Sequence, residues 1–115
     1  MADEEISRPF MTDEEFIEMA EKDGVSMTLC TVSWCNQNEK IMEVFQRLIF
    51  RFSAYGVRYD FADPNTVTSL RAKYNVRSMP TILIMKDGEV YAEMVGITDE
   101  DQVIPTMYEA LEIDI

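Results

Sequence analysis

A tryptophan and a cysteine, Trp34 and Cys35, stand where an apolar, β-prone run gives way to a helical pattern. Residues 27–32 are typical of a strand, and a long amphipathic repeat begins at about residue 39. The backbone N–H groups and the positive dipole end of a helix N-terminus stabilise a thiolate. Cys35 is therefore a candidate nucleophile.

The residues that follow Cys35 limit its chemistry. Asn36 and Gln37 come next, and Asn38 stands where a second cysteine would complete a Cys-x-x-Cys motif. The chain's other cysteine, Cys30, lies five residues earlier in a mostly extended interval. At roughly 3.3 Å per residue, its Cα should be farther from that of Cys35 than the ~7 Å at which a disulfide forms. Cys30 is better interpreted as a small buried core residue.

The composition excludes several function classes. The chain has 115 residues, a formal net charge of −12 and no histidine. Without histidine, catalysis by a Cys-His pair or a Ser-His-Asp triad is excluded. Two cysteines, one on a strand and one at a helix start, are a poor set of zinc ligands. The negative field disfavours nucleic acid and anionic membranes. We expect no metal, no cofactor, no nucleic-acid partner and no membrane span, and there is no phosphate-binding loop.

Domain organisation and compartment follow from the same features. Residues 1–11 are predicted to form an acidic N-terminal lead-in, and residues 12–115 a single domain. The first five residues lack the basic and apolar regions of a signal peptide. Two cysteines do not make a disulfide framework. We therefore expect a cytoplasmic protein.

The first half of the chain predicts an α/β unit. Thr12 and Glu15 form a capping box that opens a helix to about residue 22, and residues 26–33 predict a strand buried on both faces. The elements expected next are a helix at about 36–54, a strand at 57–62, and a short helix that starts at Asp63-Pro64 and runs to about residue 74.

The second half predicts a hairpin and a last helix. Strands at 81–85 and 90–95 flank an Asp87-Gly88 turn signal, so they should pair antiparallel. The last helix should run from about residue 99, or later, to Leu111. Pro105 lies within that pattern, and the helix either kinks there or starts late.

Pro80 is the second candidate for a site. It precedes the strand at 81–85, and both the end of the first strand and the start of this hairpin can face the same rim of a mixed sheet. A proline has no N–H for the ladder, so neighbouring backbone groups stay available to a bound peptide.

Together these segments make the chain resemble the thioredoxin family. The resemblance is carried by Val32-Ser33-Trp34-Cys35, by Tyr74-Asn75-Val76-Arg77-Ser78-Met79-Pro80-Thr81, and by Lys86-Asp87-Gly88-Glu89-Val90 followed by Gly96. It implies a three-layer α/β/α fold with a mixed sheet of four to five strands, a cis peptide bond before Pro80, and a groove between Cys35 and Pro80 for a partner's extended segment. By this match Cys35 is the nucleophile, Trp34 the flanking aromatic residue, and Met79-Pro80 the contact with the partner strand.

Three departures from the family pattern agree with one another. Asn38 replaces the resolving cysteine, Leu29 replaces the buried acid that handles its proton, and Tyr59 falls about where a lysine partners that acid. Once the second thiol is lost the acid is only a buried charge, and leucine should stabilise the core. The chain is therefore not expected to be a self-sufficient dithiol reductase.

Two functions stay open. In the first, Cys35 exchanges with a disulfide of a protein partner, with Trp34, Asn36, Gln37, Asn38, Met79 and Pro80 lining the groove, and an external thiol such as glutathione releases the adduct. In the second, the chain is a redox-inactive module that binds a protein partner or belongs to a larger assembly. The three losses favour the second, and the retained Trp34-Cys35 pair favours the first.

Overall fold

A computed structural model describes residues 11–32 and 38–113 of the chain. In these residues four strands form one mixed sheet with the order β2-β1-β3-β4. β1 pairs parallel with β2, whereas the pairs β1–β3 and β3–β4 are antiparallel. The strands are β1 (Val25–Cys30), β2 (Arg58–Ala62), β3 (Thr81–Lys86) and β4 (Glu89–Val95).

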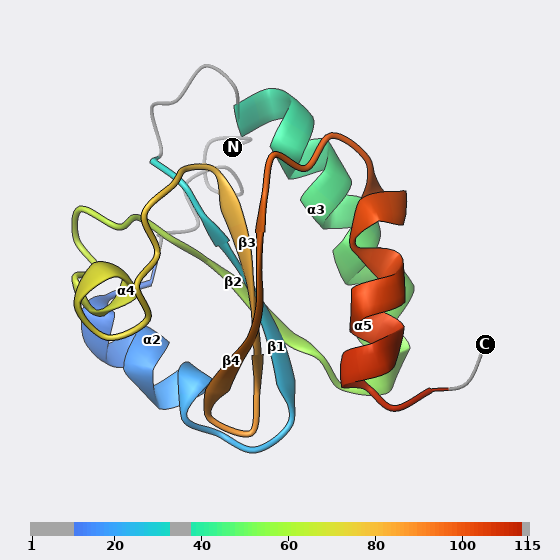
Figure 1. The fold of residues 1–115 in the computed structure, drawn as a ribbon, viewed down its shortest axis with the longest axis horizontal. Coiled ribbons are helices and arrows are strands. Elements are labelled where there is room, and N and C mark those ends of the chain that lie inside the picture. Colours follow the sequence, from blue (N-terminus) through green and yellow to red (C-terminus); the bar gives the residue numbers. More distant parts are fainter. Residues whose placement is uncertain (1–10, 33–37, 114–115) are drawn as a thin grey trace, which may run out of the picture.

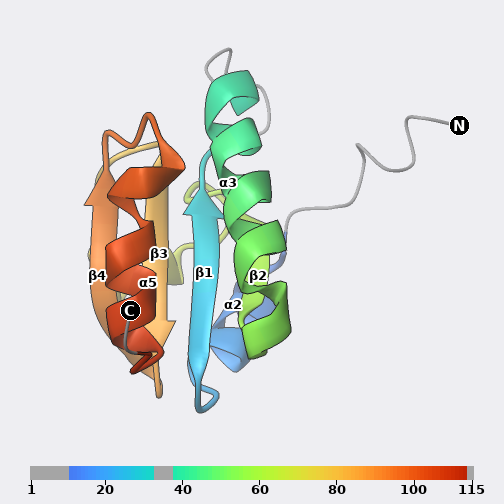
Figure 2. The ribbon, with the colours of Figure 1, turned by 90° about the vertical axis from the view of Figure 1, so that its right-hand side faces the viewer.

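Helices cover both faces of this sheet (Figure 1). α2 (Asp13–Ala20) and α4 (Ser69–Ala72) lie on one face, and α3 (Asn38–Phe52) and α5 (Ile104–Ala110) lie side by side on the other (Figure 2). Two 3-10 turns complete the described elements: η1 (Ser53–Tyr55) extends α3, and η2 (Glu100–Gln102) precedes α5. The predicted three-layer α/β fold with a mixed sheet is confirmed.

The buried strand β1 divides the core in two. All six of its residues are buried, which is why its sequence, apart from Ser26, is apolar or β-branched without alternation. Alternate side chains face opposite layers. Met27 and Leu29 pack with Phe45, Leu48 and Phe52 under α3 and α5. On the other face, a smaller cluster under α2 and α4 contains Phe16, Cys30, Leu70, Tyr74, Leu83 and Met85.

Local signals explain where two elements begin. The Thr12 hydroxyl accepts the Glu15 N–H at 3.1 Å, and the Glu15 carboxylate accepts the Thr12 N–H at 2.8 Å, which completes the predicted capping box. In the β3–β4 hairpin, Asp87 and Gly88 have φ values of 53° and 85°, as its two-residue turn requires. The Asp87 carboxylate also accepts the Gly24 N–H at 2.7 Å, which ties this turn to the start of β1.

The helix predicted to start at Asp63-Pro64 is wrong. The Asp63 carbonyl accepts the N–H groups of Thr66 and Val67, and its carboxylate accepts the Asn65 N–H, so the chain closes a turn there. Helix α4 starts only at Ser69, whose N–H donates to the Asp13 carboxylate at 3.0 Å. That cap comes from α2, 56 residues earlier, and has no signal in the local sequence.

The question of Pro105 is decided in favour of a late start. η2 ends at Gln102, α5 begins at Ile104, and Pro105 occupies its first turn, where no intrahelical N–H donor is needed.

Strand β1 ends at Cys30 rather than at the predicted residue 33. Its neighbours stop there, because β2 ends at Ala62 and β3 starts only after Pro80.

Candidate functional site

The strand register gathers the predicted site segments at one rim of the sheet. Cys30, the last residue of β1, is paired with Ala62 of β2 and with Thr81 of β3. Thr81 is in turn paired with Val95 of β4. The chain that leaves β1 toward α3, the turn after β2, the approach to β3 and the exit from β4 therefore share this edge, at the top of the sheet in Figure 1.

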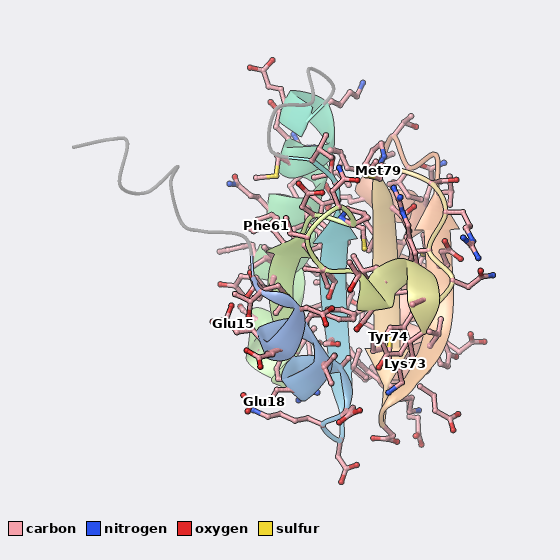
Figure 3. The ribbon with its side chains drawn as sticks, turned by 90° about the vertical axis from the view of Figure 1, so that its left-hand side faces the viewer. Glu15, Glu18, Phe61, Lys73, Tyr74 and Met79 are labelled. Atoms are coloured by element: carbon pink, nitrogen blue, oxygen red, sulfur yellow. The ribbon has the colours of Figure 1, made fainter. Side chains whose placement is uncertain are left out.

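The approach to β3 carries two of the predicted site residues, Met79 and Pro80. Their peptide bond is cis, which is the geometry that the resemblance implies. Met79 is 41% exposed and lies at the upper end of the sheet in Figure 3, whereas Pro80 is half-buried. The buried Thr81 hydroxyl donates a 2.7 Å hydrogen bond to the Ser78 carbonyl and so closes the segment around Pro80.

The other predicted site residues are not described by the structure. Trp34, Cys35, Asn36 and Gln37 lie outside the described residues. Asn38 is the first residue of α3, but its side chain also lies outside the description. The structure describes the residues on either side of positions 33–37, Val32 and the start of α3, but it does not describe the Cys35 thiol.

Cys30 is a core residue, as predicted. Its side chain is fully buried under α2 and α4, and its Sγ is 3.9 Å from the Thr28 carbonyl oxygen. Burial, together with the negative charge of Glu93, raises the pKa of the Cys30 thiol to about 12. A thiol that stays protonated at neutral pH is a poor nucleophile, so Cys30 is not a substitute for a resolving cysteine.

The structure leaves an apolar environment where the family pattern has a buried acid. Leu29 is fully buried in the core under α3 and α5. Tyr59 in β2 is 40% exposed and is paired with Met27 rather than with Leu29. The position of Leu29 is therefore filled by hydrocarbon, and moving a charge into it would carry a large desolvation cost.

The described residues contain no group of His, Cys, Asp and Glu that could hold a metal ion. Within the same residues, no helix has both the length and the apolar character that crossing a membrane requires.

Comparisons with known proteins agree with this geometry. The thioredoxin family model matches residues 8–109, nearly the whole chain. The chain belongs to the thioredoxin family. That membership supports a function of the thiol–disulfide oxidoreductase type, which in this family is directed at protein substrates.

Individual relatives are thioredoxins of fungi, plants and bacteria. The chain is 32% identical over 76 residues to thioredoxin Asp f 29 of Aspergillus fumigatus, a match that covers 66% of this chain and 69% of that protein. It is 30% identical to a thioredoxin of Staphylococcus epidermidis, over 79% of this chain and 86% of that one. Among solved structures, a mutant thioredoxin from Halobacterium salinarum shares the fold, with a TM-score of 0.75, 22% identity, and coverage of 92% and 91% of the two chains.

The sequence patterns missed two surface features of this thioredoxin-family chain. One is an open hollow of about 420 Å³ beside α4, with Arg71 and Arg77 in its lining. The other is a hollow of about 650 Å³ along the outer face of α3, beside Phe50, which is 84% exposed. Phe50 falls outside the apolar stripe of its helix, a signal that the sequence does carry. Arg71 and Arg77 line the same hollow only because the loop after α4 folds back, and a loop path of this kind leaves no periodic pattern in the sequence.

Proposed function

We propose that this chain is a monothiol member of its family, in which Cys35 exchanges with a disulfide of a protein partner held along Met79 and Pro80. The observation that supports the proposal is the register of β1 with β3. It sets Pro80 beside the strand end from which the chain runs on to Trp34 and Cys35. The resemblance assigns those residues to nucleophile, flanking aromatic and partner contact, with Asn36, Gln37 and Asn38 completing the groove.

The proposed exchange conserves disulfides. The Cys35 thiolate attacks one sulfur of the partner disulfide, a new S–S bond forms to Cys35, and the second partner sulfur leaves as a thiolate that takes up a proton. Asn38 has no thiol with which to attack the resulting mixed disulfide. An external thiol such as glutathione must therefore attack it, which frees either the partner or Cys35. A reducing compartment such as the cytoplasm supplies such thiols.

The first test is the reactivity of Cys35. Its alkylation rate by iodoacetamide, measured against pH in the Cys30→Ala variant, should give a thiol pKa below about 7.5. Incubation with a disulfide-containing protein such as insulin should yield a Cys35 mixed disulfide that persists until glutathione is added. A thiol pKa of about 8.5 or above, together with no trapped partner, would contradict the proposal.

The second test adds the missing thiol. Asn38→Cys restores the family's dithiol spacing, so the variant should release its partner without glutathione, whereas the Asn38→Ser control should not. If neither variant nor the parent forms an adduct, exchange at Cys35 is excluded.

A redox-inactive binding module is the second candidate. The buried Leu29 supports it, because a chain that no longer moves a proton at this position gains stability from an apolar side chain there. In that case Cys35→Ser should bind its partner as tightly as the parent chain does. If Cys35→Ser does not bind the partner, and a variant with a thiol at this position binds it again, the redox-inactive module is ruled out.

A further inference from the structure

A hollow beside the rim has a lining of hydrogen-bond donors and apolar atoms. It lies between the turn after β2, helix α4 and the loop that leads into β3. Its volume is about 420 Å³, and its lining residues are Pro64, Asn65, Thr68, Arg71, Ala72 and Arg77. Both charged residues of this set are arginines, in a chain whose net charge is −12.

Neither arginine has a carboxylate partner among the described residues. They share this with Lys22, Lys40 and Arg58, whereas other described cations are paired: Arg47 and Arg51 lie 3.6 and 3.9 Å from Glu100. Lys73 and Lys86 are similarly paired with Glu21 and Glu112. Arg71 and Arg77 are both exposed, so their guanidinium groups are available to a ligand.

One of the two guanidinium groups is held in place. The Arg77 Nε donates to the Asn75 Oδ1 at 2.8 Å, and Asn75 adopts a left-handed conformation with φ of 60°. This contact uses one donor and leaves the two terminal nitrogens of Arg77 without a partner in the described residues. A guanidinium group oriented in this way loses less side-chain entropy when it binds.

Two carboxylates of the segments around the hollow accept hydrogen bonds from the backbone. Asp63 precedes Pro64, and its carboxylate accepts the Asn65 N–H at 2.8 Å. Asp13 accepts the Ser69 N–H at 3.0 Å. Both carboxylates keep their negative charge, but within the described residues neither forms an ion pair with Arg71 or Arg77.

The hollow belongs to the same rim as Pro80. Ala62, which ends β2 just before the turn at Asp63, and Thr81, which follows Pro80, are both paired with Cys30. Arg77 precedes Pro80 by three residues, so their Cα atoms are at most ~11 Å apart, about the length of three extended residues.

We propose that the hollow binds the carboxylate of an Asp or Glu side chain in the partner segment that lies along Pro80. The inference rests on the proposed function, which places the partner there. Guanidinium groups bind carboxylates through charge-assisted, often bidentate, hydrogen bonds. The net charge of −12 repels a strongly acidic partner at long range. The partner is therefore a segment with one acidic residue about three positions from its contact with Pro80, in a protein that is otherwise neutral or basic.

The test uses synthetic peptides with a single cysteine, activated as a mixed disulfide with neutral 2-mercaptoethanol. A series of these peptides carries either Glu or Gln at each position within five residues of the cysteine. The rate at which Cys35 forms a mixed disulfide with each peptide is measured for the parent chain, for Arg71→Gln/Arg77→Gln and for Arg47→Gln/Arg51→Gln. The last variant is the matched control, because it loses the same charge from the α3 face.

At one or two adjacent positions, the Glu peptide should react about three- to tenfold faster than its Gln counterpart. The Arg71→Gln/Arg77→Gln variant should lose that preference, and the control variant should keep it. Equal loss in both variants would identify a long-range charge effect and overturn the inference. So would the absence of any preference in a parent chain that does react with the Gln peptides, an outcome that leaves the proposed function intact.

A second measurement separates the site from the chemistry. If Cys35 reacts with no peptide, the proposed function fails, and the site is then examined in Cys35→Ser. The arginine Nε–H signals of Arg71 and Arg77 in NMR spectra should move when the Glu peptide is added and stay in place with the Gln peptide. A response to inorganic phosphate without a response to the Glu peptide would overturn the assignment to a partner carboxylate.

Discussion

Thr81 donates a 2.7 Å hydrogen bond from its buried hydroxyl to the carbonyl oxygen of Ser78. The bond spans Met79 and Pro80, so the first residue of β3 holds the segment that the proposed partner would contact. Thr81 is also the residue that faces Cys30 across the sheet. The hydrogen bond therefore links the conformation of the Met79-Pro80 segment to the register of β1 and β3.

Replacing Thr81 with valine should remove this bond without changing the side-chain shape. We expect the free energy of unfolding to fall by about 1 kcal/mol. The matched control is Thr28→Val: Thr28 is also fully buried on this face of the sheet, but its hydroxyl has no hydrogen-bond partner among the described residues. That variant should be as stable as the parent or more so. Urea unfolding of the three proteins decides the matter, and equal effects of the two substitutions would show that the Ser78 contact contributes nothing.

Cys30 should make stability fall at alkaline pH. Burial, and next the charge of Glu93, raise the pKa of its thiol from 9.0 to about 12, so only the unfolded chain ionises it between these values. The stabilisation is fully present below pH 9 and is lost as the pH rises toward 12. Because pH 10 is one unit above the pKa of the unfolded chain, the free energy of unfolding of the parent should by then have fallen by about 1.4 kcal/mol relative to that of Cys30→Ala. Unfolding free energies of both proteins at pH 8 and pH 10 test this, and parallel pH profiles would refute it.

Asp13 should support helix α4 from a distance. Its carboxylate accepts the Ser69 N–H at 3.0 Å, and we expect Asp13→Ala to lower the free energy of unfolding by about 1 kcal/mol. Glu14→Ala is the control, because Glu14 is an exposed residue of the same helical turn. Amide hydrogen exchange should accelerate at Ser69 in Asp13→Ala and not in Glu14→Ala. Unchanged exchange at Ser69 would mean that the cap does not hold the start of α4.

The same contact shows where sequence reasoning succeeds and where it stops. The capping box of Thr12 and Glu15, the Asp87-Gly88 turn and the apolar run of β1 are local signals, and each predicted the correct element. The local sequence predicts too early a start for helix α4, because the observed start at Ser69 depends on Asp13, which lies 56 residues away.

The candidate site divides in the same way. The pairing of Cys30 with Thr81 follows from the hairpin and from the resemblance, so the position of Pro80 at the rim could be predicted. The shared hollow of Arg71 and Arg77 could not be predicted, because it depends on the left-handed turn at Asn75 and on the path of an irregular loop.

Leu29 offers the last test of what this chain has lost. It is fully buried, and Tyr59 stands in the neighbouring strand β2 where the family pattern has a lysine, so Leu29→Asp should lower the free energy of unfolding by about 3 kcal/mol or more at pH 7. Leu29→Asn is the matched control, because it has the shape and polarity of the aspartate without its charge. Both variants create the same mismatch with the apolar core, so the difference between them measures the burial of a charge.

That difference should be at least about 1 kcal/mol at pH 7, and it should shrink as the pH falls toward about 4, where the aspartate of the unfolded chain also binds a proton. Urea unfolding of both variants at pH 7 and pH 4.5 gives the comparison. If Leu29→Asp is as stable as Leu29→Asn at pH 7, a charge is tolerated at this position. The chain would then have kept an environment suited to the family's buried acid, and its proton-handling apparatus would not have been lost together with the second thiol.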